Sequence, residues 1–484
     1  MGTLSKQDWQ ALSQKLLRRE TTVSQTLEPL LSAMADGNAQ AHAFVWIDVK
    51  RTTKQEEICD KRWQAGHPRP LEGLLLAVKD NADVQSMPTR HGSRCAADTV
   101  AGESSGLIKK LEAAGAVIVG KTNLPELATL PHTMNALDGI TPNYWDKRYT
   151  AGGSSGGSAV AVAAGWAIAG HGNDGGGSLR IPASCASLFA LKPARGRLSK
   201  APDLGDVLAG WATDGFITRS VEDTADLLDN TAGYELGDPY WLSSEPVPFS
   251  LGIRQSLRSL RIGWTAHAPL GLPVHPAARQ AVQTAAEACR HLGHHVQEHT
   301  PRLWTQPEET AAIVEDMMKF WAVGTAWSAR VLSLKKGTLL PDCLETHNAR
   351  LWEAGHKVSA PEYLQLMMRL QKAARYFMES WQQFDVILTP MLAMPPLSLD
   401  DVSRQMQSGA GYVDFLMKGF GFSPFALWAN LTGQPAAQWP VFWANGLPLG
   451  VQAIGPAGGD MLLLQLSFRL QQAGFFLPDP PERH

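Results

Sequence analysis

Two glycine-rich segments place serine side chains where they could act as nucleophiles. The first covers residues 152–158 and reads GGSSGGS, and the second covers residues 174–182 and reads DGGGSLRIP. Glycine clusters cost backbone entropy, so a folded chain keeps them where the backbone must approach another group closely or adopt a positive φ. Free N–H groups in such a loop can converge on one atom, which is the geometry of an oxyanion hole. Serines within them are candidate nucleophiles if a base lies nearby.

Lys79 is the residue that could serve as this base. It follows the apolar residues 74–78 (LLLAV), so we expect its side chain to be drawn into the interior. Burial disfavours the ammonium form and can lower the pKa of a lysine by as much as about 3–5 units. A neutral lysine is a competent base, and it could deprotonate Ser178 through Ser154, because a hydroxyl can donate and accept at once. The alternative is that Lys79 is a surface residue beside Asp80 and that the glycines form ordinary turns.

Two other motifs compete with this interpretation. Residues 115–122 (GAVIVGKT) match a phosphate-binding loop formally, but their apolar, β-branched centre suits a strand better than a flexible cradle. Ser154 and Ser155 each stand in a G-x-S-x-G nucleophile elbow, yet the preceding residues 145–149 (WDKRY) are polar, whereas such an elbow follows an apolar strand. We therefore favour neither a nucleotide site nor an α/β-hydrolase site.

The segments around these motifs predict an α/β fold. Short apolar strands are expected at residues 43–47, 74–78 and 116–119, with a helix at 107–114 between the last two. A buried helix is expected at residues 159–169, between the two glycine-rich segments. This alternation implies a mixed or parallel sheet with helices on both faces.

Composition argues against several classes of protein. The chain has 484 residues and a net charge of −3, so we expect no nucleic-acid partner. No apolar run approaches the roughly 20 residues of a membrane span, and residues 1–20 lack the apolar core of a signal peptide, so we expect a cytoplasmic protein with no membrane partner. The five cysteines form no CxxC pair and are interpreted as free thiols in a reducing compartment. The fourteen histidines lack metal-ligand spacing, so neither a metal nor another cofactor is expected.

Taken together, the motifs resemble those of the amidase signature family over nearly the full length of the chain. The segments that carry the resemblance are residues 70–73 (PLEG), 77–81 (AVKDN), 120–123 (GKTN), 152–158, 174–182 and 388–390 (LTP). Residues 172–178 (GNDGGGS) are similar to those of amidases of small amides, such as the cyclic-dimer hydrolases of nylon oligomers.

The resemblance implies a single α/β/α domain over residues 1–484. Its large, twisted, mixed and mostly parallel sheet would be sandwiched between helices. The signature core would span about residues 70–200, and a helical region over about residues 235–380 would cover it within the same domain. The sequence leaves a homodimer open.

The resemblance also implies a Ser–cis-Ser–Lys triad. Ser178 would be the nucleophile and Lys79 the base, with Ser154, which follows a cis peptide bond in the family, as the bridging residue. The backbone N–H groups of Gly175, Gly176 and Gly177, together with that of Ser178, would form the oxyanion hole.

Three further residues are expected to support the triad. Asp174 and Arg180 stand on either side of the nucleophile and are expected to pair and hold its loop. Ser155 is expected to orient Ser154.

The resemblance implies an amidase that cleaves a small-molecule carboxylic amide or ester through an acyl-enzyme on Ser178. Water activated by the same relay would then release the acid. Two alternatives stay open at this point. An amine could capture the acyl group in place of water, which would make the protein an acyl transferase of a specialised-metabolite pathway, or the site could be inactive in a binding protein.

Pocket residues in the family come from the middle helices and late loops. The candidates in this chain are Met317, Trp321, Met391, Trp428 and Trp439. They predict a substrate with an apolar or aromatic acyl group. The alternative is that Met and Trp at such spacing belong to the core.

Overall fold

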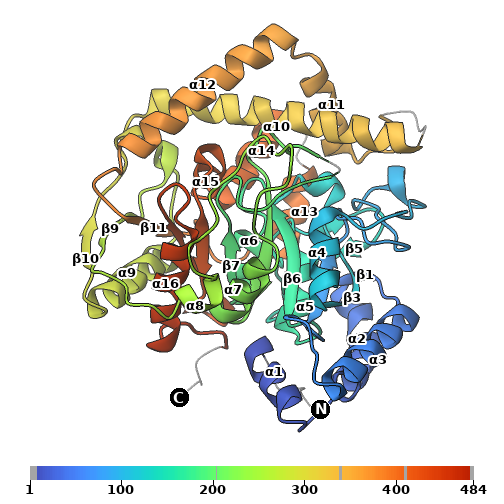
Figure 1. The fold of residues 1–484 in the computed structure, drawn as a ribbon. Helices are drawn as coiled ribbons and strands as arrows, with labels where there is room; N and C mark the ends of the chain where they lie inside the picture. Colours follow the sequence, from blue (N-terminus) through green and yellow to red (C-terminus); the bar gives the residue numbers. More distant parts are fainter. Residues whose placement is uncertain (1–7, 203, 337–340, 408–410, 480–484) are drawn as a thin grey trace.

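An eleven-stranded sheet runs through the centre of the computed structural model, which describes residues 8–202, 204–336, 341–407 and 411–479 (Figure 1). Its strands follow the order β1 (Phe44–Trp46), β3 (Val117–Thr122), β2 (Leu75–Lys79), β6 (Ala169–Asp174), β8 (Thr213–Thr218), β7 (Phe189–Lys192), β12 (Ala436–Trp439), β15 (Val451–Ile454), β11 (Val386–Pro390), β9 (Arg261–Trp264) and β10 (His295–Glu298). Two separate hairpins pair β4 (Met134–Asn135) with β5 (Gly139–Ile140), and β13 (Trp443–Ala444) with β14 (Leu447–Pro448).

Parallel pairing is confined to the two flanks of the sheet. It joins β3, β2 and β6 on one flank and β11, β9 and β10 on the other. The pairs between β6 and β11 are antiparallel, and β8, which follows β7 in the chain, is inserted between β6 and β7. The large mixed sheet is confirmed, and the parallel strands expected to dominate it form only these flanks.

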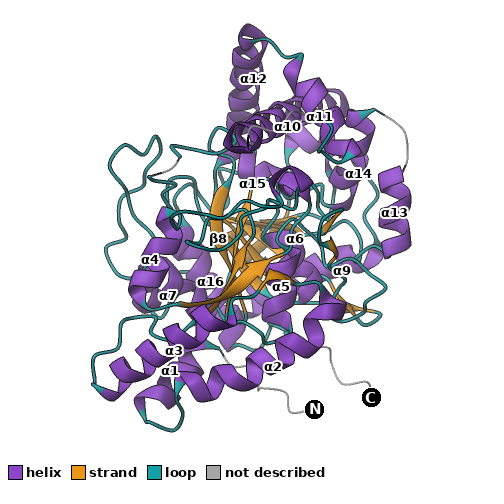
Figure 2. Cartoon of the chain, turned by 90° about the vertical axis from the view of Figure 1, so that its right-hand side faces the viewer, coloured by secondary structure: helices purple, strands orange, loops and turns teal. Residues whose placement is uncertain are grey.

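Helices cover both sides of the sheet (Figure 2). Those placed around its faces and lower end are α1 (Trp9–Leu17), α2 (Val23–Ala41), α3 (Val49–Gln64), α4 (Gly106–Ala114), α5 (Gly156–Ala163), α6 (Arg180–Ala186), α7 (Val221–Asp229), α8 (Phe249–Gly252), α9 (Pro276–His291) and α16 (Asp460–Gln472). The α/β class expected from the alternation of elements is therefore confirmed.

A layer of helices lies across the top of the sheet in Figure 1. It contains α10 (Pro307–Lys336), α11 (Thr346–His356) and α12 (Ala360–Glu379), with α13 (Leu399–Gln407), α14 (Tyr412–Phe422) and α15 (Leu427–Thr432) beneath or beside them. The region 235–380, expected as a cover, also supplies β9 and β10 to the sheet. Among all the residues that the structure describes, no helix is both long and apolar enough to cross a membrane.

The signature segments mostly fold as their sequence patterns predict. Strands β1, β2 and β3 and helix α4 confirm the four elements expected before residue 123. The helix expected over residues 159–169 is shorter, because α5 ends at Ala163 and Gly165 turns the chain at a φ of 75°. Residues from Ala169 onward belong to β6 and pair with β2.

The cysteines differ from the sequence-based interpretation. Cys95 and Cys343 form a disulfide, whereas Cys59, Cys185 and Cys289 are free and buried. The interpretation of all five as free thiols is therefore wrong. The paired residues are 248 positions apart in the sequence, and packing of α10 beside the short helix Arg94–Ala96 brings them together. Local spacing of cysteines carries no information about such a contact.

Candidate active site

Lys79 ends strand β2 and is fully buried. Its Nζ lies 2.7 Å from Oγ of Ser154 and donates a hydrogen bond to Oδ1 of Asn173 at 2.8 Å. Burial lowers the pKa of the Lys79 amine to about 7, although the Asp174 and Asp214 carboxylates favour the charged form. A substantial fraction of this amine is therefore neutral near neutral pH and able to accept a proton.

Ser154 lies in the loop that leads into α5. A cis peptide bond joins it to Gly153, as expected. Gly153 packs tightly against the backbone of His132, since a Cβ atom there would lie 2.7 Å from the His132 nitrogen. The neighbouring Ser155 donates its backbone N–H to the carbonyl of Ser178 at 3.1 Å, which joins the two serine loops.

The side chain of Ser155 does not have the predicted orienting role. Its buried hydroxyl has no hydrogen-bond partner among the residues that the structure describes. Its backbone supports the site instead, because its N–H is donated to the Ser178 carbonyl and joins the two serine loops.

Ser178 lies in the loop between β6 and α6 and is 8 % exposed. Gly177 before it has a φ of 114°, and a Cβ atom there would lie 2.7 Å from that of Ala426, so the loop requires glycine at this position. In the described part of the chain, the Ser178 hydroxyl makes no hydrogen bond to Ser154. Catalytic hydrogen bonds are often long or misaligned before substrate binds, so a rotation of Ser178 would be needed to complete the relay.

Asp174 and Arg180 pair as expected and hold this loop. Nε and Nη2 of Arg180 each donate to Asp174 at 2.8 Å, and both side chains are fully buried. Burial alone would raise the pKa of the Asp174 carboxyl, but the Arg180 guanidinium and the Asn430 amide hold it below its usual range. The loop thus contains a fixed ion pair beneath the nucleophile.

The expected oxyanion hole needs one correction. The N–H of Gly177 donates to Oδ1 of Asp174 at 2.7 Å, so it is already used. The N–H groups of Gly175, Gly176 and Ser178 make no hydrogen bond within the described ranges. They remain the donors available to a developing oxyanion.

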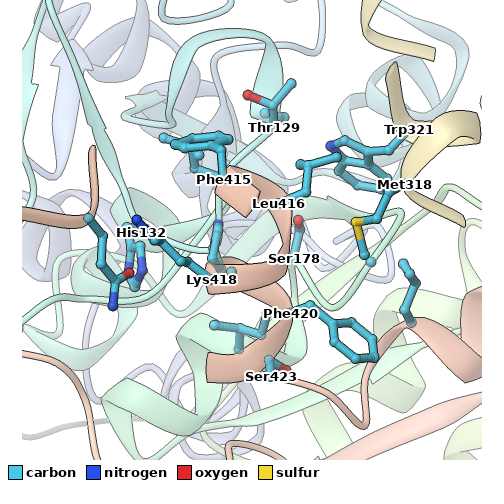
Figure 3. Close-up of a pocket in the computed structure, with 18 of the residues that line it drawn as sticks. Thr129, His132, Ser178, Met318, Trp321, Phe415, Leu416, Lys418, Phe420 and Ser423 are labelled. Atoms are coloured by element: carbon cyan, nitrogen blue, oxygen red, sulfur yellow. The ribbon is translucent and has the colours of Figure 1, made fainter. Parts of the chain in front are cut away.

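Two cavities meet at Ser178. The apolar cavity, of about 90 Å³, lies under α10 and α14 and is lined by residues that include Met317, Met318, Phe415, Leu416 and Phe420 (Figure 3). The second cavity is larger, about 560 Å³, and most of its wall is apolar, with side chains such as Leu107, Val207 and Trp327. We call it the polar cavity because Ser154, Asn173, Lys200 and Asp214 line it near the nucleophile loop. The two cavities share Ala128, Thr129, Ser178 and Trp321 as lining residues.

The predicted pocket residues divide into two groups. Met317 and Trp321 line the apolar cavity, as expected. Met391, Trp428 and Trp439 line neither cavity and are fully buried in the core, so their assignment to the pocket is wrong. The indole N–H groups of the two tryptophans are satisfied inside the core, by the Pro424 carbonyl at 3.2 Å and the Ser467 hydroxyl at 2.8 Å.

Asn173 is a site residue that was not predicted from the sequence. Strands β2 and β6 are parallel neighbours, so the polar residues at their carboxyl ends, Lys79 and Asn173, meet at one edge of the sheet. This pairing is the signal that could have identified Asn173. Over the ranges that the structure describes, no three His, Cys, Asp or Glu side chains are grouped so that they could hold a metal ion.

Comparisons with known proteins agree with this arrangement. Residues 25–464 match the family profile described as Amidase. The chain is 34% identical to a putative amidase of Synechocystis sp., over 83% of this chain and 75% of that protein. It is 29% identical to a 6-aminohexanoate-cyclic-dimer hydrolase of Pseudomonas sp., over 97% and 96% of the two chains. A solved structure of 6-aminohexanoate cyclic dimer hydrolase superposes with a TM-score of 0.90 at 27% identity and covers 97% of each chain.

Proposed function

Because the chain belongs to the amidase signature family of carbon–nitrogen hydrolases, we propose that it hydrolyses a small-molecule carboxylic amide through an acyl-enzyme on Ser178. The observation that carries this proposal is the buried contact of 2.7 Å between Lys79 and Ser154, next to the exposed edge of Ser178. The neutral Lys79 amine takes a proton from Ser154, which in turn takes the proton of Ser178 as its Oγ attacks the carbonyl.

The tetrahedral oxyanion forms beside the nucleophile loop. The N–H groups of Gly175, Gly176 and Ser178 stabilise its charge, while Asp174 and Arg180 keep the loop in place. The relay then returns a proton to the leaving nitrogen, and the carbon–nitrogen bond breaks. Water deprotonated by the same relay releases the acid and restores Ser178.

The residues that line the two cavities suggest which half of the substrate each cavity holds. Ser154 must reach the leaving nitrogen, and it lines the polar cavity but not the apolar one. The amine half of the substrate therefore occupies the polar cavity. The acyl half occupies the apolar cavity, whose methionine, leucine and phenylalanine side chains favour an apolar or aromatic group.

A substrate panel tests the proposal. It contains aryl, alkyl and peptide-like amides together with 6-aminohexanoate cyclic dimer, and products are identified by mass. We expect hydrolysis of amides with apolar acyl groups, and stoichiometric attachment of an acyl-serine probe to the peptide that contains Ser178. Ser178→Ala should lose both turnover and labelling while its melting temperature stays near that of the wild type.

Each alternative has its own outcome in this experiment. Labelling at Ser154 or Ser155 would contradict the assignment of the nucleophile. Formation of a new amide in the presence of added amine, in preference to the acid, would identify an acyl transferase. Absence of labelling and of turnover across the panel would indicate a binding protein.

A further inference from the structure

Residues 127–129 form part of the wall where the two cavities meet. Ala128 and Thr129 line both cavities, as Ser178 does, and Leu127 lines the polar one. Leu127 and Ala128 have φ values of 53° and 60°, a left-handed conformation that residues other than glycine rarely adopt. Such a conformation persists only where the surrounding structure holds it. The segment therefore needs partners that keep it in place.

Asn348 of α11 is such a partner. Its Nδ2 donates to the carbonyl and to Oε2 of Glu126, at 3.1 and 2.9 Å. The Thr129 hydroxyl lies 2.8 Å from Oδ1 of Asn348 and 3.1 Å from the Glu126 carbonyl, so its shorter contact is the one to Asn348. Asn348 and Glu126 are fully buried. One amide side chain thus bonds to the residues on either side of the left-handed pair.

The Glu126 carboxylate is itself fixed by several donors. Its Oε1 accepts a hydrogen bond from the buried Ser93 hydroxyl at 2.7 Å, and its Oε2 accepts one from the backbone N–H of Glu345 at 2.8 Å. Glu345 immediately precedes α11, so the carboxylate lies at the positive end of this helix. Burying a carboxylate is costly unless hydrogen bonds satisfy it, and these donors do so. Helix α11 is therefore joined to residues 126–129 by a buried hydrogen-bond network.

We propose that Asn348 is a positioning residue for substrate binding, which fixes residues 127–129 and thereby determines which acyl groups fit beside Ser178. This inference rests on the proposed function, because it takes the two cavities to hold the two halves of an amide. In the described chain, the three hydrogen bonds of Asn348 involve neither Lys79 nor Ser154 nor Ser178. Its loss should therefore change the selection of substrates and leave the proton relay intact.

Asn348→Ala tests the inference with two measurements. The first is hydrogen exchange of the peptide that contains residues 127–129, whose backbone N–H groups are all hydrogen-bonded. We expect exchange there to be about tenfold faster than in the wild type, because the segment loses the contacts that hold it.

The second measurement uses anilides of increasing acyl length. For the acyl group that the wild type prefers, KM should rise about tenfold while kcat changes by less than about threefold, which is the result of losing a binding interaction. The preference for that group over acetyl should fall accordingly. A small acyl-serine probe should still label Ser178 at nearly the wild-type rate.

Asn38→Ala is the matched control. Asn38 of α2 also bonds through both atoms of its amide, to the backbone of Phe44 at 2.8 Å each, but it lines neither cavity. Both measurements should stay at their wild-type values in this variant. If Asn348→Ala fails to fold, Thr129→Val should also speed the exchange, whereas Thr129→Ser, which keeps the hydroxyl, should not. Equal exchange in these two variants would overturn the inference.

Two further results would overturn it. One is wild-type exchange at residues 127–129 in Asn348→Ala, and the other is fast exchange with an unchanged preference for acyl groups. The proposed function fails separately, if no amide is hydrolysed and Ser178 is not labelled. Calorimetry with the free acids of the series then tests Asn348 without catalysis. Weaker binding to Asn348→Ala than to Asn38→Ala supports the inference, and equal binding overturns it.

Discussion

Two buried lysines show why geometry, and not burial alone, identifies the base. Burial lowers the pKa of both Lys79 and Lys192 to about 7. Nζ of Lys192 donates to the Pro193 carbonyl at 2.8 Å, and the residue lines neither cavity. Of these two lysines, Lys79 is the one that combines the perturbed pKa with a serine hydroxyl beside the nucleophile.

The first prediction is a pH profile governed by Lys79. The neutral amine is the active form, so kcat/KM for an amide should be low in acid, rise with a midpoint near pH 7 and level off above it. Lys79→Ala should lose most of the activity together with this dependence. Lys192→Met, which removes a buried lysine outside the site, should retain the midpoint, and a midpoint that moved in this variant would contradict the assignment.

The second prediction concerns Asn173. Its side-chain oxygen accepts a hydrogen bond from Nζ of Lys79 without adding a charge. Asn173→Asp would place a carboxylate there, which favours the ammonium form and should raise the pKa of Lys79 by about 1–3 units. The pH–rate profile should therefore shift to higher pH, with reduced activity at pH 7. An unshifted profile in a folded variant would show that Lys79 does not govern the reaction.

Side chains of the site were predictable to different degrees. Lys79, Ser154 and Ser178 stand in recognisable motifs, and the Asp174–Arg180 pair follows from charges on either side of a nucleophile. The use of the Gly177 N–H by Asp174 depends on loop dihedral angles, which the sequence leaves open. Tryptophan is a residue type that is common in pockets, so the sequence alone could not exclude Trp428 and Trp439. Their complete burial in the structure shows that they belong to the core.

At the scale of elements, the disulfide connects the signature core to the helical layer. Cys95 belongs to the short helix Arg94–Ala96, and Cys343 precedes α11. Both lie in a small apolar cluster with Ala329 and Leu332 of α10, and Leu332 also lines the polar cavity. The crosslink therefore connects the segment around Cys95 in the signature core to the helical layer beside one wall of the site.

The third prediction follows from this connection. Cys343→Ser should destabilise the protein by about 2–4 kcal/mol, because the unfolded chain gains freedom when the long loop is no longer closed. Thermal unfolding measures the effect. A reductant should lower the melting temperature of the wild type and leave that of Cys343→Ser unchanged. If reductant does not change the melting temperature of the wild type, Cys95 and Cys343 are free thiols and the disulfide is contradicted.

Local elements were easier to predict from sequence than their pairing. The patterns of β2, β3 and α4 are local, and each was located to within a few residues. The insertion of β8 between β6 and β7 and the contact between Cys95 and Cys343 involve residues remote in sequence. Apolar periodicity reports which face of an element is buried, but it does not report which element covers that face.

At the scale of the whole molecule, the layer formed by α10–α12 lies across the top of the sheet (Figure 1), and its helix α10 lines both cavities of the site. Trp321 of α10 lines both cavities and abuts the nucleophile loop, since a Cβ atom at Gly176 would lie 3.2 Å from its ring. Its indole therefore forms part of the partition between the acyl and amine sides.

The fourth prediction is that this partition limits the size of the acyl group. Trp321→Ala should open the apolar cavity into the polar one and raise kcat/KM for bulky acyl groups relative to acetyl, as measured on a series of anilides. Trp327→Ala is the matched control, because Trp327 lies on the same helix but lines only the polar cavity. An equal change of the ratio in both variants would rule out a partition by Trp321.

The position of Ser178 between two cavities has a consequence for the order of events in turnover. On the proposed mechanism, a cleaved amide becomes two fragments in separate compartments, and only one of them is still bonded to the protein. Release is then ordered, with the amine first and the acid last. The concentration of free amine, and not that of the acid, therefore determines how much of the acyl-enzyme reverts to the amide.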